Sequence, residues 1–118
     1  MKNVQFSATQ KAAIVSLLIE MINIDDTVDP RERDVFDAIC AENAIDEETY
    51  RLGRSLDCMI ALDMMKAMSD RQKLAAAFLL TRVIDADAHD DDREIMLFNI
   101  ICKETGVDTL INAIDDKE

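Results

Sequence analysis

The chain has 118 residues, 49% of them hydrophobic, and it carries 25 acidic residues against 13 lysines and arginines, a net charge of −12. This length suits one domain with its own core, and the acidic balance argues against nucleic-acid or anionic-membrane binding, both of which need a basic face. Three cysteines without a C-x-x-C spacing fit a reducing cytoplasm. No apolar run is long enough to predict a signal peptide or a membrane span.

Helices are predicted throughout, because the chain has only two glycines and one proline and no alternating strand pattern. The helices are expected over residues 8–23, 30–43, 47–52, 60–67, 70–85 and 92–104, with a last short helix capped by Asp108. Gly53 is expected to end the third helix. The two long helices follow Ser-x-x-Gln capping boxes and are apolar nearly all round, so both are expected to be central and buried. Phe78 and Ile95 are expected to face the core.

The two halves of the chain repeat each other at an offset of 62 residues. Without a gap, sixteen of the forty positions from 7 to 46 match their counterparts, whereas chance gives about two or three. The sequence therefore predicts an all-α single domain, residues 1–118, of about six to seven helices with pseudo-two-fold symmetry. Repeat one covers about 7–46, a connector 53–68, and repeat two about 69–114.

Each repeat carries the acidic pattern D-x-x-x-D-x-x-E directly after its long helix. The six acids are Asp25, Asp29, Glu32, Asp87, Asp91 and Glu94. The spacing places the first Asp at the end of one helix, the second at the N-cap of the next, and the Glu one turn further in, so that all three can face one point. Clustered carboxylates repel one another, and a hard divalent cation such as Ca, Mg or Mn relieves that repulsion. A divalent-cation site is predicted, either one in each loop or one shared by both.

Helix capping is the competing explanation for part of this pattern. Asp29-x-x-Glu32 and its counterpart in repeat two read as capping boxes, with acids favoured at helix N-termini by the dipole. Capping does not explain Asp25 and Asp87, which stand at helix C-terminal ends where negative charge is unfavourable. The loops are not EF-hands, because they lack the glycine at the sixth position and the glutamate at the twelfth.

Other chemistry-bearing side chains have structural explanations. His89, in the second loop, is better explained as a solvated residue than as a nitrogen ligand. Cys40 and Cys102 each follow a phenylalanine on an apolar helix face and are expected to be buried and inert. The methionines between residues 59 and 68 are expected to fill the core. No nucleophile has a credible base and no Gly-rich phosphate loop is present in the sequence, so no enzyme activity is predicted.

The segments Ile24–Glu32 and Ala86–Glu94 resemble the tellurite-resistance protein TerB-like family, in which an apolar helix, A-D-G-x-[VI]-D-x-x-E and an inward-facing helix occur twice. That family includes the N-terminal region of a membrane-anchored DnaJ-like co-chaperone. The resemblance covers about residues 7–114. It implies an all-helical fold, a divalent-cation site on those acids, a stress or tellurite response through protein partners, and no established enzyme activity. Asp26 and Ala88 stand where the family has glycine, and a left-handed backbone there suits Ala88 poorly.

Three functions are compatible with these features. The first is a cytoplasmic TerB-like module that binds divalent cations, and the second is a metal-independent acidic domain that docks a basic protein partner. A metal-dependent hydrolase is the weakest, because no aromatic pocket is predicted to accompany the acids. Saturable binding of a divalent cation separates the first function from the second.

Overall fold

Seven α-helices make up the part of the chain that this computed structural model describes, residues 4–24, 29–86 and 92–115. They are α1 (Ala8–Asn23), α2 (Pro30–Glu42), α3 (Glu47–Ser55), α4 (Cys58–Lys66), α5 (Asp70–Ala86), α6 (Asp92–Thr105) and α7 (Val107–Asp115). No strand occurs in these ranges, which confirms the all-α class. None of the helices formed by the described residues is both long enough and apolar enough to cross a membrane.

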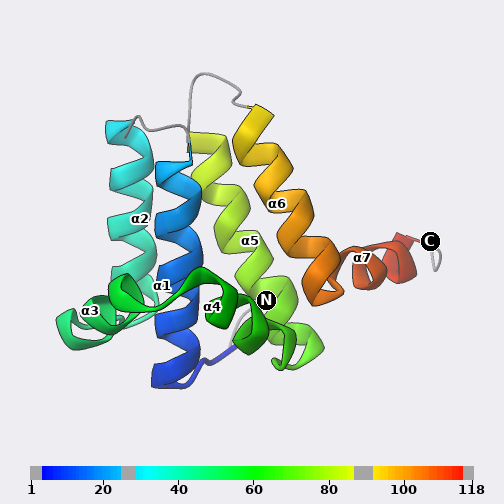
Figure 1. Cartoon of the computed structure of the whole chain (residues 1–118), viewed down its shortest axis with the longest axis horizontal. Coiled ribbons are helices and arrows are strands. Elements are labelled where there is room, and N and C mark those ends of the chain that lie inside the picture. Colours follow the sequence, from blue (N-terminus) through cyan, green and yellow to red (C-terminus); the bar gives the residue numbers. More distant parts are fainter. Residues whose placement is uncertain (1–3, 25–28, 87–91, 116–118) are drawn as a thin grey trace.

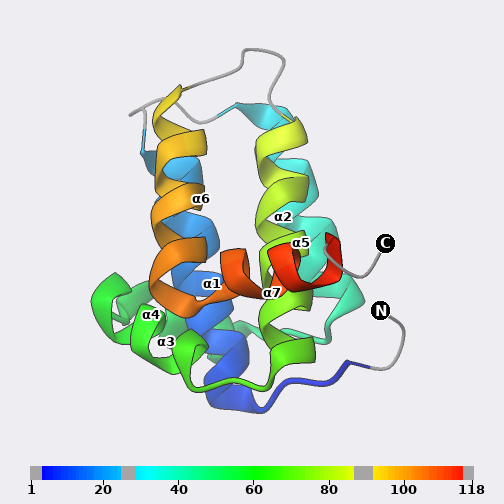
Figure 2. The same cartoon turned by 90° about the vertical axis from the view of Figure 1, so that its right-hand side faces the viewer.

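Four long helices, α2, α1, α5 and α6, stand side by side, as Figure 1 shows. Helices α3 and α4 cross one side of α1 and pack closely against it. Helix α7 lies across the lower parts of α5 and α6 (Figure 2). The short helices therefore cover the long ones away from the end of the molecule at which α1 and α5 end and α2 and α6 begin.

Helix α1 is the centre of the core and contacts α2, α3, α4, α5 and α6. Its N-terminus has the expected capping box, in which the backbone N–H of Gln10 donates to the Ser7 hydroxyl and the Ser7 N–H donates to the Gln10 side chain. The buried residues of α1 are Ala12, Ala13, Ile14, Val15, Ser16, Leu17, Leu18, Met21 and Ile22. A helix that is apolar nearly all round is stable only when it is covered on most sides, and the fold meets that requirement.

The contacts between the two repeats are reciprocal. Helix α2 of repeat one packs against α5 of repeat two, and α6 of repeat two packs against α1 of repeat one. The side chains of Gln10 and Gln72, which are counterparts at the 62-residue offset, exchange two hydrogen bonds, with N···O distances of 3.3 and 3.0 Å. Self-complementary pairing of equivalent residues is the contact expected beside a two-fold axis, although the overall symmetry of the two halves stays a prediction.

Gly53 does not end the third helix, contrary to expectation. It is buried inside α3, which continues to Ser55. A Cβ added at Gly53 would stand 2.6 Å from the carbonyl oxygen of Ala12 and 2.6 Å from Cβ of Val15. The glycine is therefore present for the close approach of α3 to α1, and its weak helix propensity is overridden by packing.

Three smaller expectations are also wrong. Phe78 and Ile95 do not face the core, since they are 60% and 40% exposed. Met59 is exposed as well, although Met65 and Met68 fill the core as expected. The last helix begins at Val107, directly after Gly106 with its φ of +85°, so that Asp108 lies in its first turn and does not serve as its cap.

Candidate functional site

The ends of four helices that flank the acidic segments lie together at one end of the molecule. Figures 1 and 2 show the C-terminal ends of α1 and α5 and the N-terminal ends of α2 and α6 on the same side. The chain enters and leaves each acidic segment at this end. Of the six predicted metal ligands, Asp25, Asp87 and Asp91 lie outside the described residues, as does His89. Asp29, Glu32 and Glu94 are described.

Asp29 is the N-cap of α2, as the sequence predicts. Its carboxylate accepts a hydrogen bond of 2.8 Å from the backbone N–H of Arg31, and the Arg31 guanidinium lies 3.7 Å from the same oxygen. In the predicted capping box, the Asp29 carboxylate would instead accept from the backbone N–H of Glu32, one residue further along. The backbone N–H and the guanidinium of Arg31 therefore hold the Asp29 side chain at the start of α2.

Glu32, the third residue of α2, has no exposed surface. It precedes Phe36 by four residues and Ile39 by seven, and both of those are buried. Residues at these spacings share one face of a helix, so the apolar face of α2 carries the carboxylate inward at its first turn. The spacing was visible in the sequence and is the signal that this glutamate is internal.

Glu94 repeats this placement in α6 and also has no exposed surface. It is the third residue of its helix, four residues before the partly buried Phe98 and seven before the buried Ile101. The duplication therefore places one carboxylate at the same inward position of each repeat. Glutamate is almost never fully buried unless it is paired or coordinates a metal.

The burial of Glu32 and Glu94 sets an energetic requirement. An ionised carboxylate taken out of water costs several kcal/mol after relaxation of the protein. A helix N-terminus contributes about 0.3–1 kcal/mol, and at most about 2 kcal/mol, in compensation. The dipole of α2 or α6 alone is therefore too weak. Both carboxylates also interact with other groups of the chain.

No three Asp, Glu, His or Cys side chains among residues 4–24, 29–86 and 92–115 are placed together so that they could hold a metal. Half of the predicted ligand set falls in the gaps between these ranges. The described residues thus provide the inward glutamate of each repeat and the capping aspartate of the first.

The three cysteines are free thiols. Cys102 is buried, as expected. The pKa of its thiol is raised to about 11, mainly by burial and to a smaller extent by the negative charge of the nearby Asp108. Cys40 is only half-buried, contrary to expectation, although burial still raises its pKa. Burial also raises the pKa of Cys58. A raised pKa lowers the fraction of reactive thiolate, so none of the three is an activated nucleophile.

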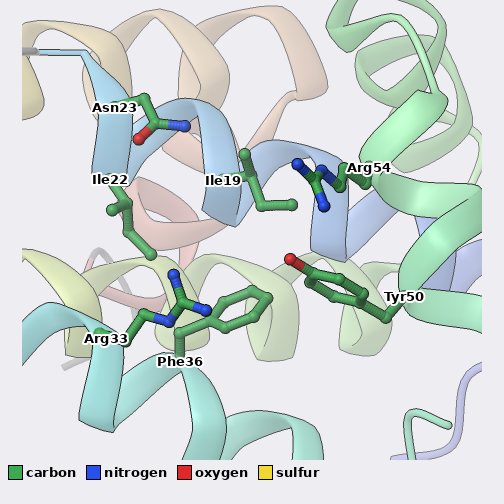
Figure 3. Close-up of a pocket in the computed structure, with 7 residues that line it drawn as sticks. All are labelled: Ile19, Ile22, Asn23, Arg33, Phe36, Tyr50 and Arg54. Atoms are coloured by element: carbon green, nitrogen blue, oxygen red, sulfur yellow. The ribbon is translucent and has the colours of Figure 1, made fainter. Parts of the chain in front are cut away.

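A pocket of about 250 Å³ lies between α1, α2 and α3, where Ile22 and Asn23 near the end of α1 and Arg33 near the start of α2 contribute to its lining (Figure 3). It is lined by Ile19, Ile22, Asn23, Arg33, Phe36, Tyr50 and Arg54. Figure 3 shows the guanidinium groups of Arg33 and Arg54 and the hydroxyl of Tyr50 pointing toward the space between the three helices. No pattern in the sequence predicts this group, because three separate helices contribute to it and the acidic repeat does not include it.

Comparison with known proteins identifies the fold alone. No protein-family model matches the chain, and no curated protein matches it. A protein of unknown function from Porphyromonas gingivalis has a similar crystal structure, with a TM-score of 0.73 and 21% sequence identity over 87% of this chain and 86% of that one. This likeness supports the helical arrangement and carries no information on ions or ligands.

Proposed function

We propose that this chain is a TerB-like helical module that binds divalent cations and acts through protein partners in a cytoplasmic stress or tellurite response. The ligands in this proposal are Asp25, Asp29, Glu32, Asp87, Asp91 and Glu94. The ion is Ca, Mg or Mn, because carboxylate oxygens suit hard cations. The observation that carries the proposal is the complete burial of Glu32 and Glu94 at equivalent positions, each inside an acid-rich segment. The acids hold the ion and have no catalytic role.

A thermal melt with and without each ion tests the proposal. An ion present at a hundred times its Kd stabilises the native state by about 2.7 kcal/mol, which for a domain of this size raises Tm by roughly 8–15 °C. Calcium, magnesium and manganese are compared with a monovalent salt at matched ionic strength. A rise of no more than about 2 °C over that control for every divalent ion contradicts the proposal. Calorimetric stoichiometry then distinguishes one shared ion from two.

Two substitutions and a control isolate the buried carboxylates. Glu32→Gln and Glu94→Gln keep the side-chain shape and remove the charge, so each is expected to raise Tm in chelator and to shrink the rise caused by the ion. Glu48→Gln, on the exposed surface of α3, removes the same charge and is expected to change neither. Loss of stability in Glu32→Gln without any change in the response to ions would show a purely structural carboxylate.

A metal-independent interaction domain is the second candidate, and an uncovered face of α5 favours it. Ser16 of α1 is 5% exposed, and its hydroxyl donates to the Leu56 carbonyl oxygen in the link between α3 and α4. Its counterpart in repeat two, Phe78, is 60% exposed. A large aromatic residue thus stands on the helix face that, in repeat one, the short helices cover.

Phe78 lines a hollow of about 310 Å³ together with Val4, Glu42, Asn43, Ala75, Leu79 and Arg82. The occupant in this candidate function is an amphipathic helix of a basic partner protein, which the charge of −12 attracts. A photo-crosslinking side chain at position 78 is expected to capture one protein in cells, while the same group at exposed Arg71 is not. Phe78→Ser, which restores the residue of repeat one, is expected to abolish binding of that protein; retained binding would exclude this face.

A further inference from the structure

The pocket between α1, α2 and α3 concentrates positive charge in a strongly acidic protein. The chain carries 25 acids and only 13 lysines and arginines, yet two arginines, Arg33 and Arg54, line one small hollow from different helices. Within the described ranges neither of them forms an ion pair, whereas Arg31, Arg51 and Arg82 each do. Arg71, which is exposed on α5, has no ion pair within these ranges either, so what distinguishes Arg33 and Arg54 is that both line the same hollow.

Apolar side chains line the pocket beside these two arginines. Ile22 and Phe36 are buried, and Ile19 is partly buried beside them. The ring of Phe36 meets that of Tyr50 edge-on, with centroids 5.9 Å apart and an angle of 65° between the planes. Arginine presents a fork of N–H donors that matches a carboxylate, and the hydroxyl of Tyr50, which points into the same space, offers one more donor (Figure 3).

We propose that this pocket binds a small organic carboxylate, whose anionic head lies between Arg33 and Arg54 and whose apolar body rests on Ile22 and Phe36. The volume of about 250 Å³ corresponds to about eight water molecules, which sets the size of the ligand. This binding does not depend on the cation site and adds a second, separate ligand to the molecule.

The internal repeat shows which lining residues the fold itself needs. Phe36 and Ile22 have identical counterparts in repeat two, Phe98 and Ile84, as expected for residues that pack the core. Arg33 is matched there by Ile95, so the helical scaffold does not require an arginine at that position. The charged part of the pocket is specific to the first repeat, which favours a ligand over a structural role.

A neighbouring hollow limits the charge of the ligand. A second space of about 290 Å³ shares Arg33, Phe36 and Tyr50 with the first, and its lining also includes Asp37, Asp46 and Glu47. An extended dianion would carry its second charge toward these acids, where a like charge is unfavourable. A single carboxylate between Arg33 and Arg54, with an apolar body that stays on Ile22 and Phe36, carries no second charge toward these acids.

Tyrosine fluorescence gives a direct assay, because Tyr50 is the only tyrosine and the chain has no tryptophan. Isocaproate, which has a branched apolar body and one carboxylate, is titrated at about 0.15 M salt, where the Debye length of about 8 Å screens the distant acids. A chelator in every sample keeps the result separate from cation binding. The expected result is a saturable change with Kd on the order of 1 mM, as befits a ligand of this size.

Matched ligands and variants decide the outcome. N-acetyltyrosinamide gives the change in tyrosine fluorescence that collisions with each ligand cause without a binding site. Isocaproamide and inorganic phosphate are expected to change the fluorescence of the protein by no more than this. Arg33→Gln and Arg54→Gln are expected to weaken isocaproate binding about fivefold or more, because each removes a charged hydrogen bond, while Arg71→Gln, an exposed residue of α5 outside the pocket, leaves Kd unchanged. Circular dichroism checks that the variants fold, and Arg33→Lys tests the fork geometry with the charge kept.

Three results would overturn the proposal. The first is no saturable change with isocaproate up to about ten times the expected Kd. The second is an equal response to isocaproamide or to phosphate, which removes the need for the carboxylate or for the apolar body. The third is an equal Kd for Arg33→Gln, Arg54→Gln and Arg71→Gln, which leaves the two pocket arginines without a role in binding.

Discussion

Replacing Gly53 by alanine tests how closely α3 is packed on α1. The added Cβ would stand 2.6 Å from the Ala12 carbonyl oxygen and 2.6 Å from Cβ of Val15. Carbon atoms in contact normally lie about 3.5–4.0 Å apart, so one helix has to move by about 1 Å. The carbonyl oxygen belongs to the backbone of the central helix and cannot turn aside as a side chain would.

Two opposing free energies set the size of the effect. Alanine stabilises a helix interior by about 0.5–1 kcal/mol relative to glycine. Overpacking of a filled site costs about 1–3 kcal/mol. We therefore expect Gly53→Ala to lower the free energy of unfolding by about 1–2 kcal/mol, which corresponds to a fall in Tm of roughly 4–10 °C for a domain of this size.

Thermal melts followed by circular dichroism measure this change, and Gly106→Ala is the matched control. No atom lies within 4 Å of a Cβ at Gly106, but its φ is +85°, so the control loses stability through backbone strain alone. Because α3 carries Tyr50, only the Gly53 variant is expected to change the native tyrosine emission. An unchanged or higher Tm for Gly53→Ala would refute the close packing of α3 on α1.

Two further predictions follow from groups with shifted pKa values. Cys102, whose pKa is raised to about 11 by burial and then by Asp108, should resist thiol labelling at neutral pH until the protein unfolds, and mass spectrometry showing rapid native labelling would contradict its burial. The hydrogen bonds from Arg82 lower the pKa of Glu42, so this pair stabilises the native state at neutral pH and the contribution is lost as pH falls through the acid range. Glu42→Gln should therefore flatten the acid side of a plot of Tm against pH. The expected change in slope is small, because the pair is solvent-exposed. An unaltered slope would show that the pair contributes nothing to stability.

The acids of the candidate cation site illustrate what can be read from sequence and where that reading ends. The identity of the six acids and the spacing of Glu32 from Phe36 and of Glu94 from Phe98 are sequence properties, and the inward position of both glutamates follows from helical periodicity. Which acids share an ion depends on the path of two acidic segments, and periodicity does not determine a path. The neighbouring arginine pocket left no pattern in the sequence, because its residues come from three helices.

By itself, the sequence determined the features that depend on neighbours within one or two helical turns. These are the all-α class, the start and end of the long helices, and the capping boxes at Ser7 and Ser69. Hydrogen bonds and side-chain contacts at short separations control such features, so local patterns reveal them.

Only the tertiary structure decided which apolar surfaces are covered. Ser16 is buried while its counterpart Phe78 is exposed, and Gly53 continues a helix that its propensity would end. The pocket that holds Arg33 and Arg54 exists because α3 crosses α1 closely enough to face α2. These features follow from the crossing of helices distant in sequence, and crossing is set by the summed packing of many side chains, which no single stretch of sequence contains.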